Sequence, residues 1–413
     1  MPIPRERGIS FFSTAGQLSG ISVIKAVRGR GSISTVDGKE GGKKGRREEE
    51  KEVFLISIRK DVAEICELIR TMGYSVKDYI IQKRDFPDRK YYVGEGKIKE
   101  IKERMERENV SLLVINDPLE PAQIYHIEKE TGAKVIDRTM LILEIFMRNA
   151  NSVEAKLQVE LAKLQYEIPL MREYVHRYKT GEHSGAYAGG EYMVDQYYDL
   201  IKRRAAKIRR TLEKYRKARE LQRARRKELN YICIALAGYT NAGKTTLLNA
   251  LAGENAYTDD RMFTTLSTLV RRVNVSKQKF LLIDTVGFID GMPLYIVDAF
   301  RSTYEEIQYA DILLLLLDGS DPPTEMLRKA QVVVGQINQY MSRFGNEKQL
   351  SKRLVPVITK ADLMDERRRE NAIQVLEMEM RQQPIVISAK TGEGLKELVR
   401  TIEEIAARIG TPT

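Results

Sequence analysis

The segment Tyr231-Ile-Cys-Ile-Ala-Leu-Ala-Gly238-Tyr-Thr-Asn-Ala-Gly243-Lys244-Thr245 indicates how the second half of this chain folds. It begins with an apolar run typical of a buried strand and continues into the pattern G-x-x-x-x-G-K-[ST], with Thr246–Leu251 opening a helix. In such a loop the glycines let backbone N–H groups surround phosphate oxygens, Lys244 contributes a positive charge, and the Thr245 hydroxyl can bind Mg²⁺. The sequence therefore predicts a phosphate-binding loop between a strand and a helix.

A second motif and a threonine-containing segment complete the expected phosphate site. Leu281–Gly287 ends a strand-like run with Asp-x-x-Gly, in which Asp284 suits the Mg²⁺ shell and the Gly287 N–H suits a γ-phosphate. Within Arg261-Met-Phe-Thr-Thr-Leu-Ser267 a threonine is expected to close over the nucleotide and bind Mg²⁺, with Thr265 the first candidate and Thr264 the second. Catalysis is assigned to Lys244, Thr265 and Gly287, and metal binding to Thr245 and Thr265.

Two further motifs are expected to contact the base of the nucleotide. Val355–Ile358 leads into Thr359-Lys-Ala-Asp362, and the Asp362 carboxylate can accept hydrogen bonds from both N–H groups on one edge of guanine, which adenine cannot supply. Ile385–Ile387 leads into Ser388-Ala-Lys390, a turn suited to packing on the guanine. Four motifs in order, each at the end of an apolar strand, predict a doubly wound α/β GTP-binding domain. The residues expected to contact GTP are Gly238, Tyr239, Thr240, Asn241, Ala242, Gly243, Lys244, Thr245, Thr246, Phe263, Thr264, Thr265, Leu266, Ser267, Asp284, Thr285, Val286, Gly287, Thr359, Lys360, Ala361, Asp362, Ser388, Ala389 and Lys390.

Position 288 departs from many GTPases. Phe288 stands directly after the Asp-x-x-Gly motif, where a glutamine often orients the attacking water, and a phenyl ring cannot do this. Hydrolysis by the protein alone is therefore expected to be slow and to be stimulated by a partner. Asn241 lies where some glutamine-lacking GTPases bind potassium, so we expect K⁺ to support faster hydrolysis than Na⁺.

Composition limits the class of protein. The 413 residues suggest two or three domains, and a hydrophobic share of 42% supplies enough apolar material for their cores. With only two cysteines, Cys66 and Cys233, a disulfide framework and a thiolate metal cluster are excluded. The longest apolar run, Ile312–Leu317, is far shorter than the roughly 20 residues of a membrane span. The sequence predicts a cytoplasmic protein without a membrane span.

The net charge of +11 is concentrated in one stretch. Residues 201–228 contain 14 lysines and arginines against three glutamates, so the rest of the chain sums to zero. A long solvated helix often carries many cations, but it usually mixes the two signs. The imbalance favours a helix that faces a polyanion such as RNA, and Arg203, Lys207, Arg210 and Lys214 are the candidate RNA-binding residues. The same charge would repel a second copy, so a monomer is expected.

The chain upstream of the phosphate loop divides into three parts. Residues 1–50 read as a flexible charged tail, and residues 51–138 alternate short apolar strands with helices, as in a parallel α/β domain. Residues 139–229 read as a helical hairpin, and 230–413 form the GTP-binding domain. Two apolar seams at steps of three and four residues predict that the hairpin is antiparallel, and Gly181, Gly185, Gly189 and Gly190 predict its tip loop. The seams are Val153, Leu157, Leu161, Leu164, Ile168, Met171 and Val175, and Ile201, Ala205, Ile208, Leu212 and Tyr215.

These motifs resemble one GTPase family. Gly238–Thr245, Phe263–Ser267 and Asp284–Ile289 are similar to the HflX GTPases, and Tyr92–Lys97 and Lys156–Ala162 are similar to that family's N-terminal parts. The resemblance covers roughly residues 52–410. It implies a Mg²⁺-dependent GTPase that binds the large ribosomal subunit and its rRNA and that splits or rescues stalled ribosomes. The tip sequence 187–191 and Thr359, where Asn is commoner, depart from the family pattern.

Two other functions fit the same residues. One is a GTPase that assembles or modifies RNA, which shares the chemistry and differs in its target. The other is a GTP-controlled switch whose hairpin pairs with a partner helix. A helix that binds another protein would balance its charges, so the +11 stretch favours the ribosomal function.

Overall fold

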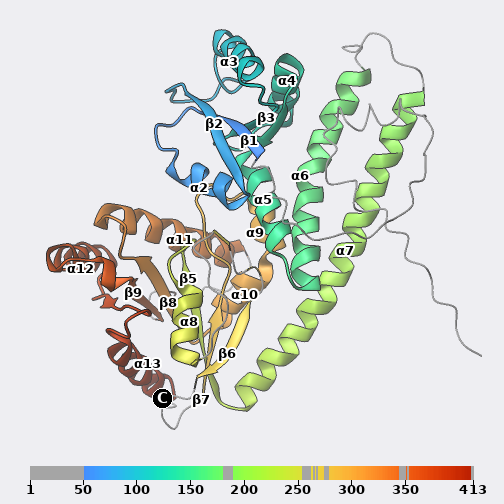
Figure 1. Cartoon of the computed structure of the whole chain (residues 1–413). Coiled ribbons are helices and arrows are strands. Elements are labelled where there is room, and N and C mark those ends of the chain that lie inside the picture. Colours follow the sequence, from blue (N-terminus) through green and yellow to red (C-terminus); the bar gives the residue numbers. More distant parts are fainter. Residues whose placement is uncertain are drawn as a thin grey trace, which may run out of the picture.

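The computed structural model describes residues 51–179, 189–253, 262, 263, 266, 268–273, 279–343, 350 and 353–410. The expected tail, residues 1–50, and most of the expected tip loop, residues 180–188, lie outside this part of the chain. The described residues form two α/β units joined by a helical hairpin, and Figure 1 places the hairpin along one side of both units. No helix in the described ranges has the length and apolarity needed to cross a bilayer.

The first unit is a parallel four-stranded sheet in the order β2-β1-β3-β4, as the sequence predicted. In β1, Val53 and Leu55 point to one face and Phe54 and Ile56 to the other, so an unbroken apolar strand supplies both faces. Helices α3 and α4 cover one face, and α2 and α5 cover the other. The elements are β1 (Lys51–Ser57), α2 (Ala63–Thr71), β2 (Tyr74–Ile81), α3 (Glu95–Glu108), β3 (Leu112–Ile115), α4 (Pro121–Thr131), β4 (Lys134–Asp137) and α5 (Arg138–Asn149).

The hairpin consists of α6 (Val153–Lys179) and α7 (Gly189–Glu228). The buried centre of its seam is Leu161 against Ala205 and Ile208, with Leu157, Leu164 and Leu212 packed around them. The opposite face of α6 buries Ala155, Val159 and Ala162 in the core that α6 shares with the second α/β unit. The apolar periodicity therefore predicted the contact between α6 and α7 correctly.

Two details of the predicted hairpin are wrong. Val153 is 63% exposed, because at the start of α6 the contact with α7 is the ion pair between Glu154 and Arg219 rather than an apolar seam. Gly189 and Gly190, which were assigned to the tip loop, are the first two residues of α7. A glycine costs little helix stability in the first turn, where the N–H groups have no intrahelical partner.

The second unit is a six-stranded sheet in the order β10-β9-β8-β5-β7-β6, with all strands parallel except β6. Helices α8 and α13 cover one face. Helices α9 to α12 cover the other face, which belongs to the same apolar core as α2, α5 and α6. The elements are β5 (Tyr231–Gly238), α8 (Lys244–Ala252), β6 (Leu269–Val273), β7 (Lys279–Asp284), α9 (Leu294–Ala299), α10 (Arg301–Tyr309), β8 (Ile312–Asp318), α11 (Pro323–Arg343), β9 (Leu354–Thr359), a 3₁₀ turn (Ala361–Leu363), α12 (Glu366–Met380), β10 (Ile385–Val386) and α13 (Leu395–Gly410).

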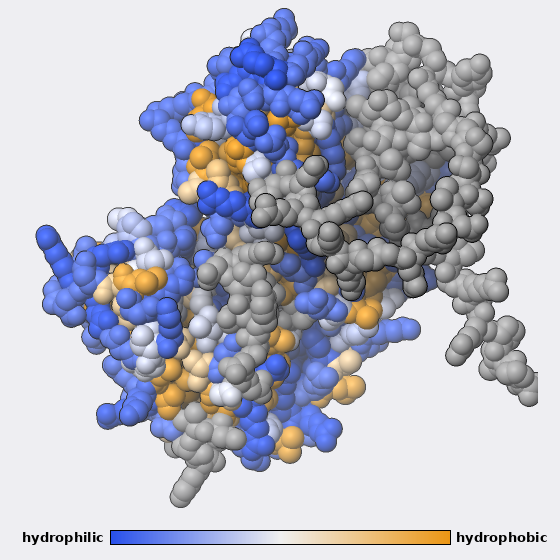
Figure 2. Space-filling model, in the orientation of Figure 1, coloured by the Kyte–Doolittle hydropathy of each residue, from blue (hydrophilic) through white to orange (hydrophobic). Residues whose placement is uncertain are grey.

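One continuous core therefore connects the two sheets. On the face shown in Figure 2 the surface is mostly hydrophilic, and apolar residues appear between hydrophilic ones as smaller patches. The aromatic contact between Phe146 of α5 and Phe300, whose ring centroids are 4.7 Å apart, is one of the packing contacts across the boundary. Because the units share buried apolar surface, a displacement of one is transmitted to the other.

Candidate nucleotide site

The phosphate loop lies between the end of β5 and the start of α8, at the carboxyl edge of the parallel strands. Gly238 cannot carry a side chain, because a Cβ there would lie 2.7 Å from the carbonyl oxygen of Leu316. Gly243 has a φ of +78°, which favours glycine, and directly precedes the N-terminus of α8. The loop therefore directs backbone N–H groups and a helix N-terminus toward one point, which is an arrangement for binding anions.

Lys244 is the charged group of this loop. Its Nζ donates to the carbonyl oxygens of Tyr239 at 2.8 Å and Gly238 at 3.1 Å, so the side chain lies across the loop. Burial lowers the pKa of Lys244 to about 8, and the nearby Asp284 carboxylate opposes this shift. A buried ammonium without a directly bonded carboxylate is a strong site for phosphate oxygens, which would raise its pKa again.

The expected metal ligand Thr245 is placed beside Asp284. The Thr245 hydroxyl donates to Asp284 Oδ2 at 2.7 Å, and Asp284 is completely buried at the end of β7. A hydroxyl and a carboxylate next to an anion loop are hard oxygen ligands of the kind that Mg²⁺ selects. The residues present therefore fit Mg²⁺ bound through Thr245, with Asp284 behind it. The other predicted metal ligand, Thr265, lies outside the described residues together with Thr264 and Ser267.

The two segments expected to bind guanine contact each other. The Ser388 hydroxyl donates to Asp362 Oδ1 at 2.6 Å, and the Ala361 N–H donates to the carbonyl oxygen of Ile387 at 3.0 Å. Lys360 has a φ of +56° and its Nζ donates to Asp318 Oδ2 at 2.6 Å. These contacts fix the Asp362 carboxylate at the rim of the site.

Thr359 has a role that the sequence did not reveal. Its Oγ1 lies 3.1 Å from the carbonyl oxygens of both Ala242 and Leu317, so it can donate to either. Thr359 thereby connects the phosphate loop to the strand that carries the guanine motif. The departure from the commoner asparagine keeps a hydrogen-bond donor at this junction.

The Asp-x-x-Gly segment lies directly on the phosphate loop. A side chain at Gly287 would be crowded, since a Cβ would lie 3.0 Å from Thr240 Cγ2 and 3.2 Å from Lys244 Nζ. Phe288 donates its N–H to the carbonyl oxygen of Gly238 at 3.1 Å and accepts from the Thr240 N–H at 2.9 Å. The Phe288 ring is buried and packs edge-on against Tyr304, with 5.7 Å between ring centroids. No water-orienting group is available from this side chain.

Two predicted contacts upstream lie in the apolar core. Phe263 and Leu266 are both buried, and the Phe263 ring packs edge-on against Phe146 with 4.6 Å between centroids. The Phe263 carbonyl oxygen accepts from Asn149 Nδ2 at 2.9 Å. Phe263 therefore anchors this segment to α5, and the side chains of Phe263 and Leu266 contribute to the apolar core and not to a nucleotide site.

The cations of α7 fall into two groups. Arg203, Lys207, Arg210 and Lys214 are exposed and line one common surface together with Ala206 and Thr211. Near the base of α7, Arg219, Arg223 and Arg226 instead pair with Glu305 and Glu306 of α10, at N–O distances between 2.9 and 3.5 Å. The expectation that the whole +11 stretch faces a partner is therefore wrong at its C-terminal end.

The chain is similar to known proteins over most of its length. Three family models match: the GTP-binding GTPase N-terminal region over residues 59–147, the GTP-binding GTPase middle region over 149–226, and the 50S ribosome-binding GTPase over 233–360. A solved GTP-binding protein from Sulfolobus solfataricus in complex with GDP is 27% identical and covers 87% of this chain and 100% of its own, with a TM-score of 0.45.

Two curated relatives are more similar in sequence. The GTPase HflX of Thermococcus kodakarensis is 41% identical over 84% of this chain and 78% of its own length. The GTPase HflX of Methanocaldococcus jannaschii is 39% identical over 85% of this chain and 85% of its own length. With the phosphate loop, the Asp-x-x-Gly segment and the guanine motifs assembled on one sheet edge, this chain belongs to the HflX family of GTPases.

Proposed function

We propose that this GTPase acts on the large ribosomal subunit, binding its rRNA through α7, and that it splits or rescues stalled ribosomes. The observation that carries the proposal is the exposed cationic surface of Arg203, Lys207, Arg210 and Lys214, which has no carboxylate partner among the described residues. The match to a family model described as a 50S ribosome-binding GTPase supports the same partner. We place the protein in the cytoplasm as a monomer.

For the hydrolysis site we propose the following roles. Lys244 binds β- and γ-phosphate oxygens, and the Gly287 N–H binds the γ-phosphate as negative charge develops on it. Mg²⁺, held by Thr245 and Thr265 with Asp284 behind, would neutralise phosphate charge. K⁺ near Asn241 is proposed as a second cation, which predicts faster hydrolysis in potassium than in sodium at equal ionic strength. The remaining residues of the four motifs surround the nucleotide.

Guanine recognition is tested at Asp362. Replacing its carboxylate in Asp362→Asn exchanges one acceptor for a donor, so one hydrogen bond to guanine is lost and the other is no longer charge-assisted. We expect GTP to bind roughly 10²- to 10³-fold more weakly, and xanthosine triphosphate to bind better than GTP. Fluorescent-nucleotide titration measures both, and Asp365→Asn, on the same loop but at the N-cap of α12, is the control. Unchanged preference for GTP in Asp362→Asn would rule out this role.

The ribosomal function is tested by reversing the four exposed cations in Arg203→Glu/Lys207→Glu/Arg210→Glu/Lys214→Glu. Binding to large subunits is expected to weaken, and its dependence on salt to become shallower by about 0.7 to 0.9 in log–log slope per lost phosphate contact. Co-sedimentation across a salt series, with GDP and with a non-hydrolysable GTP analogue, measures both quantities. GTP binding should not change, because these side chains lie outside the nucleotide motifs.

The matched control reverses four exposed cations on α3 and α13 instead of α7: Lys99, Arg107, Lys396 and Arg400. It makes the same change in net charge and should retain the binding and the salt dependence of the parent. If the α7 variant sediments with large subunits as well as the parent does, α7 is a solvated strut. Binding of free RNA but not of ribosomes by the parent would instead indicate a GTPase for RNA assembly or modification, and binding of neither would indicate a protein partner.

A further inference from the structure

The side chain of Thr240, in the middle of the phosphate loop, carries a buried hydroxyl without a hydrogen bond. Thr240 is only 6% exposed, and its Oγ1 has no donor or acceptor partner among the residues that the structure describes. A buried hydroxyl in this state costs free energy, because it has given up its hydrogen bonds to water and gained none in return. Such a group in a ligand-binding loop indicates a partner that arrives with the ligand.

Two other buried threonines of the nucleotide site show the difference. Thr285 Oγ1 donates to the carbonyl oxygen of Leu236 at 2.6 Å, and Thr359 Oγ1 lies 3.1 Å from two carbonyl oxygens. Both of these hydroxyls are used within the protein and help to hold the strand ends together. The hydroxyl of Thr240 is not used in this way, so it is available to a ligand.

The backbone around Thr240 is held on both sides and cannot easily shift to find a partner for the hydroxyl. The Thr240 N–H donates to the carbonyl oxygen of Phe288 at 2.9 Å. The preceding residue, Tyr239, donates its hydroxyl to Glu64 Oε1 of α2 at 2.5 Å and accepts from the N–H of Asp290 at 2.8 Å. Rotation about χ1 is therefore the motion that remains open to the Thr240 side chain.

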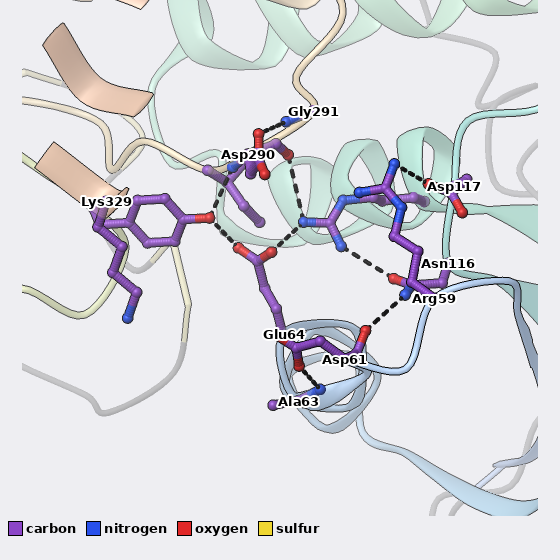
Figure 3. A network of polar contacts seen from close by, with 12 residues as sticks. Arg59, Asp61, Ala63, Glu64, Asn116, Asp117, Asp290, Gly291 and Lys329 are labelled. Atoms are coloured by element: carbon purple, nitrogen blue, oxygen red, sulfur yellow. Dashed lines mark hydrogen bonds and ion pairs between the residues drawn. The ribbon is translucent and has the colours of Figure 1, made fainter. Parts of the chain in front are cut away.

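The carboxylate that binds Tyr239 is itself fixed by Arg138 of α5. Arg138 Nη2 donates to Glu64 Oε2 at 2.6 Å and lies 3.4 Å from the carbonyl oxygen of Asp290. Figure 3 shows Glu64 between the helix that carries it and the turn at Asp290, with dashed contacts leading to both sides. Because Arg138 and Glu64 have side-chain exposures of only 8% and 26%, water does not readily substitute for these bonds. The start of the phosphate loop is therefore anchored, and the position of the next residue is well defined.

Thr240 packs directly on Gly287, whose N–H is proposed to bind the γ-phosphate. Thr240 Cγ2 and Cα lie 3.0 and 3.1 Å from the position that a Cβ would take at Gly287, and Lys244 Nζ lies 3.2 Å from the same position. The three residues therefore meet at one corner of the site. The methyl group of Thr240 faces this corner, and a rotation of χ1 by about 120° can bring the hydroxyl to the place of the methyl group.

We propose that the Thr240 hydroxyl donates a hydrogen bond to a γ-phosphate oxygen and so acts as a third donor, beside Lys244 Nζ and the Gly287 N–H. This inference rests on the proposed roles of Lys244 and Gly287 in hydrolysis. Phosphate oxygens accept hydrogen bonds, and a fixed donor at this place stabilises the transferred phosphoryl group without taking or giving a proton. Because GDP has no γ-phosphate, the same hydroxyl helps the site to distinguish GTP from GDP.

The test replaces the hydroxyl by a methyl group of nearly the same shape in Thr240→Val. We expect a non-hydrolysable GTP analogue to bind about 10- to 100-fold more weakly, because one hydrogen bond to a charged group is lost. The kcat/KM of GTP hydrolysis should fall by at least the same factor. The affinity for GDP should stay within about twofold of that of the parent. Thr240→Ser keeps the hydroxyl and should restore both quantities, which fluorescent-nucleotide titration and steady-state hydrolysis measure.

The stability of the ligand-free chain is a second readout, and a purely structural hydroxyl would move it in the other direction. Removing an unpaired buried hydroxyl should not destabilise the fold, so the denaturant midpoint of Thr240→Val should equal or exceed that of the parent. Thr285→Val is the matched control for stability, because it removes a buried hydroxyl that has a partner. Its midpoint should be lower than that of the parent.

Four results would overturn the proposal. They are an unchanged ratio of the affinities for the GTP analogue and GDP in Thr240→Val, an equal loss of both affinities, no recovery in Thr240→Ser, and a denaturant midpoint of Thr240→Val below that of the parent. If the parent itself did not bind GTP, the proposed hydrolysis site would be wrong as a whole. The failure of this inference is therefore distinguishable from the failure of the function on which it rests.

Discussion

The two halves of the cationic stretch in α7 have nearly the same composition and different environments. Arg203, Lys207, Arg210 and Lys214 face solvent along the middle of the helix. Three arginines nearer the C-terminus of α7 are only 13 to 18% exposed at their side chains and pair with glutamates of α6 and α10: Arg219, Arg223 and Arg226. The comparison shows that a count of charges along a helix does not say how many are available to a partner, because acids from elsewhere in the fold neutralise some of them.

The largest effect is expected from removing the glutamates at the base of α7. Glu305 and Glu306 are both only 4% exposed, so Glu305→Ala/Glu306→Ala leaves Arg223 and Arg226 without these carboxylates and Arg219 with Glu154 alone. Removing one side of a buried ion pair costs about 3 to 5 kcal/mol of unfolding free energy. Denaturant unfolding of the full chain measures this loss. The fourfold reversal of the exposed cations should change the unfolding free energy by no more than about 1 kcal/mol. If both variants lowered the free energy of unfolding equally, the exposed and the paired cations of α7 would not differ in their contribution to stability.

An intermediate effect is expected when pH changes the protonation of Lys244, and it concerns the affinity for GDP. Lys244 is a buried cation whose hydrogen-bond partners are carbonyl oxygens. Its pKa of about 8 lies below that of a free lysine, so the ligand-free protein gains stability as pH rises from about 8 toward 10.5. Bound phosphates favour the charged form, so nucleotide binding takes up a proton in this range and the affinity for GDP falls as pH rises above 8. Because one proton is taken up, the affinity for GDP can fall by at most about tenfold per pH unit.

Calorimetric titration in buffers of different ionisation enthalpy measures the proton uptake directly. Near pH 7, where Lys244 is already charged, uptake should be small and serves as the internal control. An affinity for GDP that is constant between pH 7 and 9.5 would show that Lys244 keeps its charge without phosphate, as the paired arginines of α7 do.

The smallest effect on the free energy of unfolding is expected at Arg204, whose ion pair is more exposed than the pairs at the base of α7. Its guanidinium binds Glu160 of α6 through two bonds, of 2.6 and 2.9 Å, at 38% and 27% side-chain exposure. Half-exposed pairs contribute about 0.2 to 1 kcal/mol, so Arg204→Gln should cost no more than about 1 kcal/mol, and less in high salt. A double-mutant cycle with Glu160→Gln isolates the pair. A coupling above 2 kcal/mol would place Arg204 with the buried group.

Much of this molecule was predictable from local sequence. The phosphate loop at 238–245, the Asp-x-x-Gly segment at 284–287 and the guanine motifs at 359–362 and 388–390 each lie at the end of an apolar strand, and the fold gathers strand ends at one edge. The strands and helices from 51 to 137 and the centre of the hairpin seam were predicted for the same reason: period-two and period-3.6 patterns report which face of an element is buried.

The sequence did not indicate which distant groups meet. Tyr239 and Glu64 are 175 positions apart, Arg226 and Glu306 are 80 apart, and Thr359 and Ala242 are 117 apart. A motif fixes the backbone of its own loop, but the Tyr239 side chain points out of that loop to a different unit, and no periodicity records its partner. Val153 and the first glycines of α7 were placed wrongly because the ends of a pattern carry less information than its centre.

The sequence alone therefore predicted the chemistry of the nucleotide site, since the motifs at 238–245, 284–287, 359–362 and 388–390 each hold their functional groups within a few positions. Tertiary structure alone decided which cations of α7 stay available and how the N-terminal unit reaches the segment after Gly287. The physical reason is that charge neutralisation and coupling depend on distance in space, and distances between residues far apart in the chain arise only when the two sheets and the hairpin pack around their common core.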